Sequence, residues 1–178
     1  GNDLLILIND ILDISKIEAG ELSISLSKIN LFELVENLVL DMQPLANEKG
    51  LILNYNSNIH ELFLLSDSNR IKQIVKNLMS NAIKCTDSGS IEIILEENAN
   101  DITIKVIDEG IGIAKEKIDY IFERFKQADG STTRKYGGTG LGLAISKELA
   151  SLLGGDIKAF STFGKGSTFE LILPKKTN

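Results

Sequence analysis

The chain of 178 residues is poor in the residues that build disulfide and metal sites, with Cys85 as its only cysteine and His60 as its only histidine. One cysteine excludes a disulfide framework or a cluster of thiolate metal ligands within one chain, and such scarcity is typical of a reducing, intracellular environment. The sequence also lacks any apolar run approaching the roughly 20 residues needed to cross a bilayer. No signal-peptide pattern opens it.

Basic charge is scarce as well. The chain carries 19 lysines and arginines against 25 aspartates and glutamates, for a net charge of −6. Nucleic-acid binders usually present a basic face, so this balance argues against a nucleic-acid partner. The remaining composition, 43% hydrophobic and 25% charged, is typical of a globular protein. The length suits one well-packed domain with an appendage.

The first segment, residues 4–17, has apolar residues at helical spacing, and Gly20 is a plausible helix end. A lone amphipathic helix at this position is typical of a missing partner helix or a dimer seam. Gly1 has no preceding methionine, and the first residues are predicted to lie in the middle of a helix. We therefore expect a cytoplasmic fragment of a longer protein, and the parent could be membrane-anchored.

The rest of the sequence alternates between strands and helices without a regular βαβ rhythm. After a strand at 22–26, Asn30 and Glu33 are predicted to form a capping box for a helix that kinks near Pro44 and ends at Gly50. Further strands are predicted at 51–55, 91–95, 102–107, 157–160 and 167–173, and further helices at 69–84, 115–125 and 140–153. We predict an α/β (α+β) two-layer sandwich: a mixed sheet with helices on one face, plus the N-terminal helix.

The predicted helix at 69–84 has two distinct faces. Its apolar face consists of Ile71, Ile74, Val75, Leu78, Met79 and Ala82. A second face, at steps of three and four, carries Gln73, Asn77, Asn81 and Lys84. Taken alone, this polar stripe favours a solvated surface. The alternative is that an amide oxygen completes the octahedral shell of Mg²⁺ while the lysine neutralises a phosphate.

Three glycine clusters follow in order. The first, DEGIGI at 108–113, comes directly after a strand, so that Asp108 could accept a hydrogen bond from an adenine amino group or could belong to an ordinary turn. The second, GGTGLGL at 137–143, runs into a helix, which favours an anion cradle over a plain turn. The third, GKGSTF at 164–169, is by itself an ordinary pair of glycines in a hairpin turn. Its Thr168 becomes a candidate site residue only if its strand lies beside the one that carries Asp108.

In this order, the segments RIKQIVKNLMSNAIK (70–84), DEGIGI, FERF (122–125) and GGTGLGL resemble the N, G1, F and G2 boxes of the histidine-kinase catalytic domain, a member of the GHKL superfamily. The resemblance covers roughly residues 30–174 and implies a Bergerat-type ATP-binding fold. LINDILDISKIEAG, near the start, looks like the second helix of the dimerisation and phosphoacceptor domain. We therefore expect two parts: residues 1–20 from that helix, and residues 21–178 as the catalytic domain. The sequence of residues 127–146 most resembles that of hybrid sensor kinases.

The resemblance assigns roles residue by residue. It implies ATP and Mg²⁺ as ligands, with Asn81 on the metal and Asn77 and Lys84 as the catalytic pair beside the phosphates. Asp108 would hold the adenine amino group, with Thr168 nearby through water. The backbone is implied to shape the base pocket at Gly110 and Gly112, and to bind the phosphates at Gly138, Thr139, Gly140, Leu141 and Gly142. Residues 127–137 would form the ATP lid.

The resemblance also implies partners: the phosphoacceptor helix of a homodimeric parent and a response-regulator receiver domain. The chain departs from the family pattern at two positions. Cys85 replaces an aromatic residue that often follows the N-box lysine, and Gln127 replaces an arginine found near the start of the lid in some members. GHKL ATPases activate water with a glutamate where this chain has Asn77, and an amide cannot take that proton. Phosphoryl transfer in two-component signalling is therefore expected, and a non-catalytic nucleotide-binding module or an ATPase are the alternatives.

Overall fold

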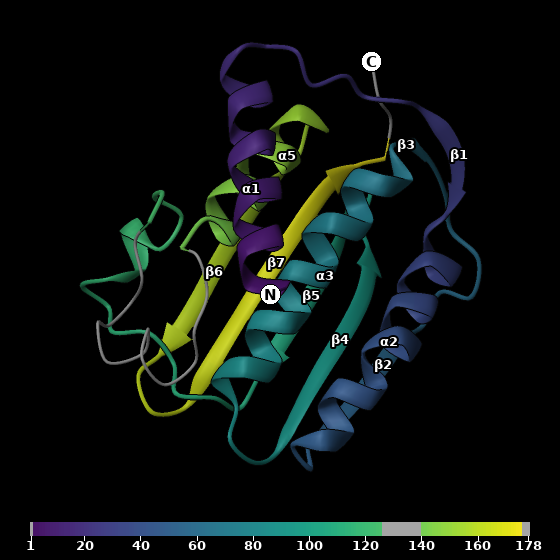
Figure 1. Ribbon diagram of the computed structural model, residues 1–178. Coiled ribbons are helices and arrows are strands. Elements are labelled where there is room, and N and C mark those ends of the chain that lie inside the picture. Colours follow the sequence, from purple (N-terminus) through teal and green to yellow (C-terminus); the bar gives the residue numbers. More distant parts are fainter. Residues whose placement is uncertain (1, 126–139, 176–178) are drawn as a thin grey trace.

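A five-stranded sheet forms the centre of the computed structural model, which describes residues 2–125 and 140–175 (Figure 1). The strand order is β2-β4-β5-β7-β6. Only the β2–β4 pair is parallel among these neighbours, and the other three pairs are antiparallel, so the predicted mixed sheet is confirmed. The strands are β2 Ile52–Ser57, β4 Ser90–Glu97, β5 Asp101–Asp108, β6 Asp156–Thr162 and β7 Gly166–Pro174.

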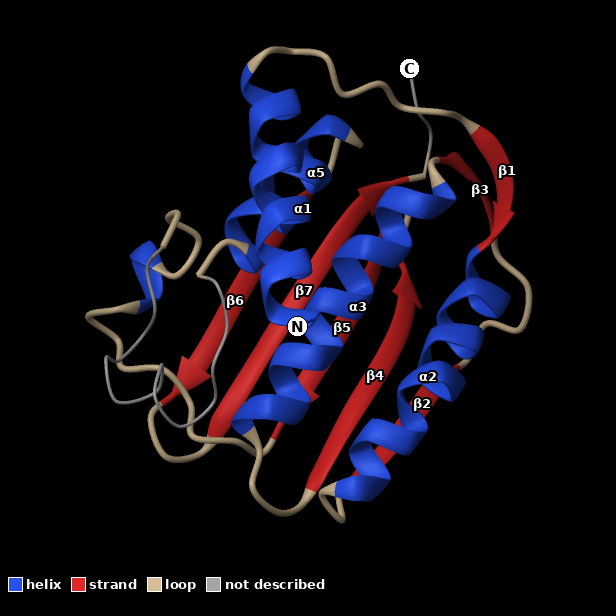
Figure 2. Ribbon diagram, viewed as in Figure 1, coloured by secondary structure: helices blue, strands red, loops and turns tan. Residues whose placement is uncertain are grey.

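Helices α2 Leu31–Glu48, α3 Ser68–Cys85 and α5 Gly142–Leu152 cover one face of this sheet, as Figure 2 shows, and α1 Asn2–Glu18 packs onto α5. Alternate strand residues face the helices and form the core. In β5 these are Ile102, Ile104 and Val106, all at most 1% exposed. The open face is polar in part, where Lys105 forms an ion pair with Glu96 at 3.0 Å. The predicted two-layer sandwich is therefore confirmed.

A second, two-stranded sheet pairs β1 (Ser27–Asn30) with β3 (Phe63–Ser66) in antiparallel register. The prediction of a strand at 22–26 was wrong, because that segment has no strand partner. Leu22 and Ile24 still alternate inward and pack against the core, while Ser25 N donates to Asp67 Oδ2 at 2.9 Å. The alternation thus reflects an extended segment lying across the core.

One further helix prediction was wrong. The helix expected at 115–125 is a single 3₁₀ turn, η1 (Ile118–Tyr120), followed by turns up to Phe125, whose φ is +60°. A left-handed residue of this kind cannot continue a helix. The expected capping at Asn30 is confirmed, since its side chain accepts from Glu33 N at 3.4 Å, and α2 continues through Pro44 to Glu48.

Helix α1 packs against the sandwich through Leu7, Ile14 and Ile17. In Figure 1 it lies in front of α5 and α3, and Asp13 Oδ2 accepts a 2.9 Å hydrogen bond from Gln73 Nε2 of α3. Its other side leaves Leu4, Leu5, Ile8, Ile11 and Leu12 between 45% and 61% exposed. In the described part of the chain, no helix combines the length and the apolar character that a membrane span requires.

Candidate functional site

Helix α3 presents the polar stripe beside the site. It begins at a side-chain cap, because Asp67 Oδ1 accepts from Asn69 N at 3.0 Å and from Arg70 N at 3.2 Å. The apolar face predicted from the sequence is buried without exception. Consequently Asn77 and Asn81 are half-buried beside it, and Lys84 is exposed in the last turn. The first member of the stripe, Gln73, binds α1 instead.

The two asparagines of α3 differ in their contacts. Asn77 Nδ2 donates to Ser146 Oγ of α5 at 3.0 Å. Among the residues that the structure describes, no hydrogen-bond partner of the Asn81 carboxamide is found. A half-buried amide with a free oxygen is a suitable ligand for Mg²⁺, which prefers oxygen donors and keeps most of its shell from phosphates and water.

No group of three or more His, Cys, Asp or Glu side chains within residues 2–125 and 140–175 could hold a metal ion. A metal cage made of these side chains is therefore not available there. A single amide oxygen fits a metal that arrives with a nucleotide, because the phosphates supply the anionic ligands. In such a site, the ion would polarise the phosphates and offset their charge.

Asp108 ends β5 with its carboxyl group buried, at 7% exposure. Its Oδ1 accepts from Gly110 N at 2.9 Å. Burial raises the pKa of Asp108, and backbone hydrogen bonds from Gly110 and Ser167 partly offset this rise. A buried carboxylate with remaining acceptor capacity can bind an amino group strongly, because such charge-assisted hydrogen bonds gain strength away from water.

The backbone around Asp108 is packed too closely for side chains. A Cβ on Gly110 would lie 2.5 Å from the carbonyl oxygen of Cys85 and 2.8 Å from Asp108 Oδ1. Gly112 has φ +72°, and a Cβ there would overlap the carbonyl oxygen of Thr162. Close packing at Gly110 therefore joins the end of α3 to the end of β5, and close packing at Gly112 joins the same loop to the end of β6.

Thr168 is not placed beside Asp108. The strands β5 and β7 are neighbours, as the sequence interpretation required, but their register puts Ser167 opposite Asp108 and Thr168 opposite Ile107. Since successive strand side chains point to opposite faces, Thr168 belongs to the open face of the sheet. The expectation that Thr168 lies near Asp108 was wrong, and Ser167 takes that place.

Glu109 holds the start of β4 in place beside Asp108, a role that the sequence interpretation missed. Its Oε2 accepts from Ser90 N at 2.6 Å and from Ser90 Oγ at 3.0 Å. Ser90 begins β4, and its neighbour Ile91 lies opposite Asp108. The carboxylate thus fixes the start of β4 next to Asp108. Its position inside DEGIGI was the only available signal.

The last turn of α3 is held by Lys49, the residue that follows α2. Lys49 Nζ donates to the carbonyl oxygens of Ile83 at 2.7 Å and Lys84 at 3.2 Å, where a cation is favourable at a helix C-terminus. Burial and the nearby Asp108 raise the pKa of the Cys85 thiol. This disfavours a reactive thiolate and favours a role for Cys85 as a small packing residue.

The described part of the glycine segment, Gly140, Leu141 and Gly142, leads into α5. Gly140 has φ +77°, and its carbonyl accepts from Phe125 N at 2.8 Å. Leu141 is fully buried, and Gly142 touches Asn77 across the helix pair. The first turn of α5 therefore lies beside the polar stripe of α3. Gly138, Thr139 and the predicted lid at 127–137 lie outside the described residues.

Two groups of predicted residues thus meet along α3. Asn77 lies against the start of α5, and Cys85 lies against Asp108 and Gly110, with Asn81 between them. Eight residues of helix separate the two contacts, which is about 12 Å at 1.5 Å per residue. One end offers a carboxylate for a base, and the other offers a helix N-terminus that favours phosphate.

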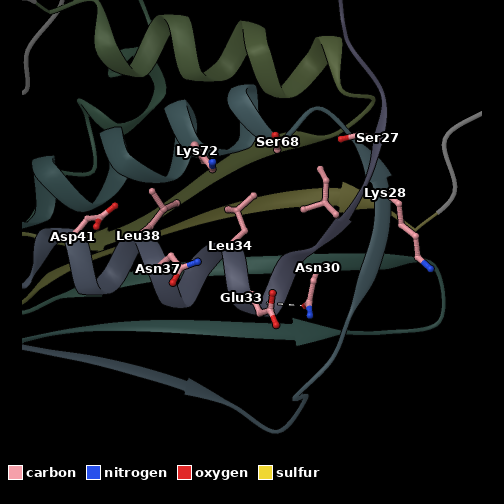
Figure 3. Close-up of a pocket in the computed structure, with 11 residues that line it drawn as sticks. Ser27, Lys28, Asn30, Glu33, Leu34, Asn37, Leu38, Asp41, Ser68 and Lys72 are labelled. Atoms are coloured by element: carbon pink, nitrogen blue, oxygen red, sulfur yellow. Dashed lines mark hydrogen bonds between the residues drawn. The ribbon is translucent and has the colours of Figure 1, made fainter.

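A separate pocket of about 360 Å³ lies between α2, β1 and the first turns of α3 (Figure 3). Glu33 and Asp41 of α2 line it together with Lys28 and Lys72. These mixed charges give no net attraction for a triphosphate, and none of the predicted nucleotide residues lines this pocket. The site along α3 is therefore distinct from it.

Residues 66–177 match the family described as histidine kinase-, DNA gyrase B-, and HSP90-like ATPase. The chain belongs to this family. Its resemblance to the ATP-binding catalytic domain of histidine kinases, predicted from the four boxes, is thereby confirmed. The predicted site residues Asn77, Asn81 and Asp108 lie within the matched residues, as do Gly110, Gly112, Gly140 and Gly142.

Relatives of this family domain include named histidine kinases. The chain is 45% identical over 179 residues to the autoinducer 2 sensor kinase/phosphatase LuxQ of Vibrio cholerae, covering 98% of the chain and 21% of that protein. It is 44% identical over 182 residues to hybrid signal transduction histidine kinase L of Dictyostelium discoideum, covering 98% of the chain and 11% of that protein. The chain thus spans about a fifth or less of the length of these relatives.

Solved structures agree with this placement. Full-length ShkA, crystallised in complex with AMPPNP, superposes with a TM-score of 0.88 at 30% identity, over 98% of this chain and 36% of that one. The catalytic domain of histidine kinase ThkA gives a TM-score of 0.75 at 26% identity, over 86% of this chain and 99% of that one. These solved structures therefore agree with the fold predicted for a histidine-kinase catalytic domain.

Proposed function

We propose that the chain binds Mg²⁺-ATP and donates the γ-phosphoryl group to a phosphoacceptor histidine supplied by another segment or chain. The observation that carries this proposal is the arrangement along α3: Asp108 at its C-terminal end, Asn81 in the middle, and Asn77 against the first turn of α5. These groups match the needs of base, metal and phosphates in that order. Catalysis would then rest on positioning and charge neutralisation.

Asn77 supports phosphoryl donation over hydrolysis. GHKL ATPases have a glutamate at this position, and a glutamate can take a proton from the attacking water. The Asn77 carboxamide cannot, and its Nδ2 is already engaged by Ser146 Oγ at 3.0 Å. A bound ATP would therefore persist until an acceptor nucleophile arrives.

His60 does not suit the role of acceptor. It is exposed in the loop between β2 and β3, where its ring meets the ring of Phe32 edge-on at 5.8 Å. This loop follows the C-terminal end of β2, whereas Asp108 lies at the sheet end where β2 and β4 begin. We place the acceptor on a helix of the parent protein that pairs with α1.

The parent is then a homodimeric kinase in which residues 1–20 belong to the dimerisation domain and residues 21–178 to the catalytic domain. The exposed apolar side of α1, with Leu5, Ile8 and Leu12, supports a partner helix there. A receiver domain is the proposed destination of the phosphoryl group, supported by the likeness to a hybrid kinase. A cytoplasmic location would follow from this role.

A phosphotransfer assay tests the proposal. The chain is incubated with γ-labelled Mg²⁺-ATP, alone and with the dimeric acceptor-helix segment of its parent. We expect an acid-labile, base-stable label on the added segment and none on the chain itself. Absence of transfer despite measured ATP binding would favour a passive nucleotide-binding module, and steady release of phosphate would favour an ATPase.

Asn81→Ala should remove the metal-dependent part of ATP binding. We expect Mg²⁺ to tighten ATP binding in the unmodified chain and to lose this effect, on the order of 10-fold or more, in the variant. Affinity for metal-free ATP should stay within about 2-fold because the base contact is intact. Titration calorimetry with and without EDTA measures both. Asn54→Ala, on the exposed side of β2, serves as the matched control.

A further inference from the structure

Ser146 is a buried serine on α5, 1% exposed, to which none of the predicted motifs assigns a role. Its hydroxyl faces α3, where Oγ accepts from Asn77 Nδ2 at 3.0 Å across 69 residues of sequence. A serine in a helix interior has a modest propensity cost, and a buried hydroxyl needs a partner. Its contact with Asn77 supplies this partner.

Gly142 lies one helical turn before Ser146 and therefore on the same face of α5. A Cβ on Gly142 would lie 2.5 Å from Asn77 Oδ1 and 3.2 Å from Asn77 Nδ2. The Asn77 carboxamide is thus enclosed between two residues of one helix. Its nitrogen meets the serine and its oxygen meets the glycine.

Electrostatics favours the same orientation of this amide. The first turn of α5 carries the partial positive charge of a helix N-terminus, which attracts an oxygen and repels an NH₂ group. The Ser146 hydroxyl can accept from the NH₂ group at the other side. Turning the carboxamide by 180° would place the NH₂ group against the positive end of the helix.

We propose that Ser146 is a positioning residue for the phosphate end of the ATP site: its hydroxyl holds Asn77 Nδ2, and so directs Asn77 Oδ1 towards the first turn of α5. This inference rests on the proposed function, in which Asn77 lies beside the phosphates. Ser146 itself does not touch the nucleotide. It acts by locking the side chain that joins the metal-binding helix to the phosphate-binding turn.

A double-mutant cycle on nucleotide affinity tests this role. Calorimetry measures binding of a Mg²⁺-loaded, non-hydrolysable ATP analogue to the unmodified chain, Ser146→Ala, Asn77→Ala and the double variant. We expect Ser146→Ala to weaken binding about 3- to 10-fold, as for one lost hydrogen bond. In the Asn77→Ala background, the same change should alter affinity less than 2-fold because its partner is gone. Equal losses in both backgrounds, or no loss in the first, would overturn the proposal.

Ser66→Ala is the matched control, since Ser66 is also a buried serine, 2% exposed, but lies on β3. Thermal unfolding of every variant separates loss of fold from loss of positioning. Ser66→Ala should leave analogue affinity unchanged whatever its effect on stability. If Ser66→Ala weakened binding as much as Ser146→Ala, the effect would be a general result of removing a buried hydroxyl, contrary to the proposal.

A second readout does not depend on nucleotide. In NMR spectra of the ligand-free chain, the Asn77 side-chain amide protons should exchange with water more slowly than those of exposed Asn54, and Ser146→Ala should remove this protection. Exchange as fast as in Asn54 would contradict the locked amide directly. Failure of the unmodified chain to bind the analogue, with the protected amide still observed, would instead refute the proposed function alone.

Discussion

Asp108→Asn is expected to weaken ATP binding roughly 10- to 150-fold, corresponding to about 1.5–3 kcal/mol for a hydrogen bond to a charged group. The Asp108 carboxylate is 7% exposed and is placed to accept from an adenine amino group. The amide that replaces it can donate to the carbonyl of guanine, so preference for ATP over GTP should also fall. Competition titrations with both nucleotides measure the affinity and the preference.

Asp101→Asn, at the other end of β5, is the matched control because it makes the same chemical change at the opposite end of the strand from Asp108. It should bind ATP as the unmodified chain does. If Asp108→Asn bound ATP within 2-fold of the unmodified chain and kept its preference over GTP, Asp108 would not be the base-recognition group.

Asp108→Asn should also change how the free energy of unfolding depends on pH. Burial raises the pKa of Asp108, so the native state holds the proton more tightly than the unfolded chain, in which the pKa is about 3.9. The contribution of this group to the free energy of unfolding is therefore full below about pH 3.9 and is lost as the pH rises through the higher native pKa. Asp108→Asn should lack this decline in denaturant titrations. An identical decline in both chains would assign it to other groups.

Gly166→Ala is expected to cost more than about 2 kcal/mol of stability, because φ is +116° and an added Cβ would overlap the carbonyl oxygen of Asp108. For a chain of this length, the melting temperature should fall by on the order of 5 °C or more. Since the overlap displaces Asp108 itself, ATP affinity should fall as well. Thermal unfolding and calorimetry follow the two effects.

Gly164→Ala separates the steric overlap from the backbone conformation. Gly164 also has a positive φ, +84°, but an added Cβ there meets nothing within 4 Å. We expect a loss of only about 1 kcal/mol, the cost of a left-handed alanine, and unchanged ATP affinity. Similar losses of affinity in both variants would show that close approach to Asp108 is not the cause.

The sequence predicted the helix-covered sheet and the faces of α3 because both depend on local periodicity. The apolar positions from Ile71 to Ala82 recur at helical spacing, and burial follows them. Alternation of the same kind at Leu22 and Ile24 predicted a strand wrongly, since it shows only which side chains face the core and not whether a second strand lies beside the segment.

Contacts between distant segments could not be predicted in this way. The β5–β7 pairing entered the sequence interpretation only as a condition, and a one-residue difference in register decides that Ser167 and not Thr168 shares a face with Asp108. The bond between Asn77 and Ser146 and the clamp of Glu109 on Ser90 join elements 69 and 19 residues apart. Such contacts depend on how layers pack, and no spacing in the sequence indicates them.

Calorimetric titration of the chain with ATP, with and without Mg²⁺, tests the central claim most directly. The arrangement of Asp108, Asn81 and the first turn of α5 predicts one nucleotide per chain, tighter binding with Mg²⁺, and weaker binding of GTP. Absence of saturable Mg²⁺-ATP binding by the folded chain, or equal binding of GTP, would contradict a site built for adenine and a metal-bound triphosphate.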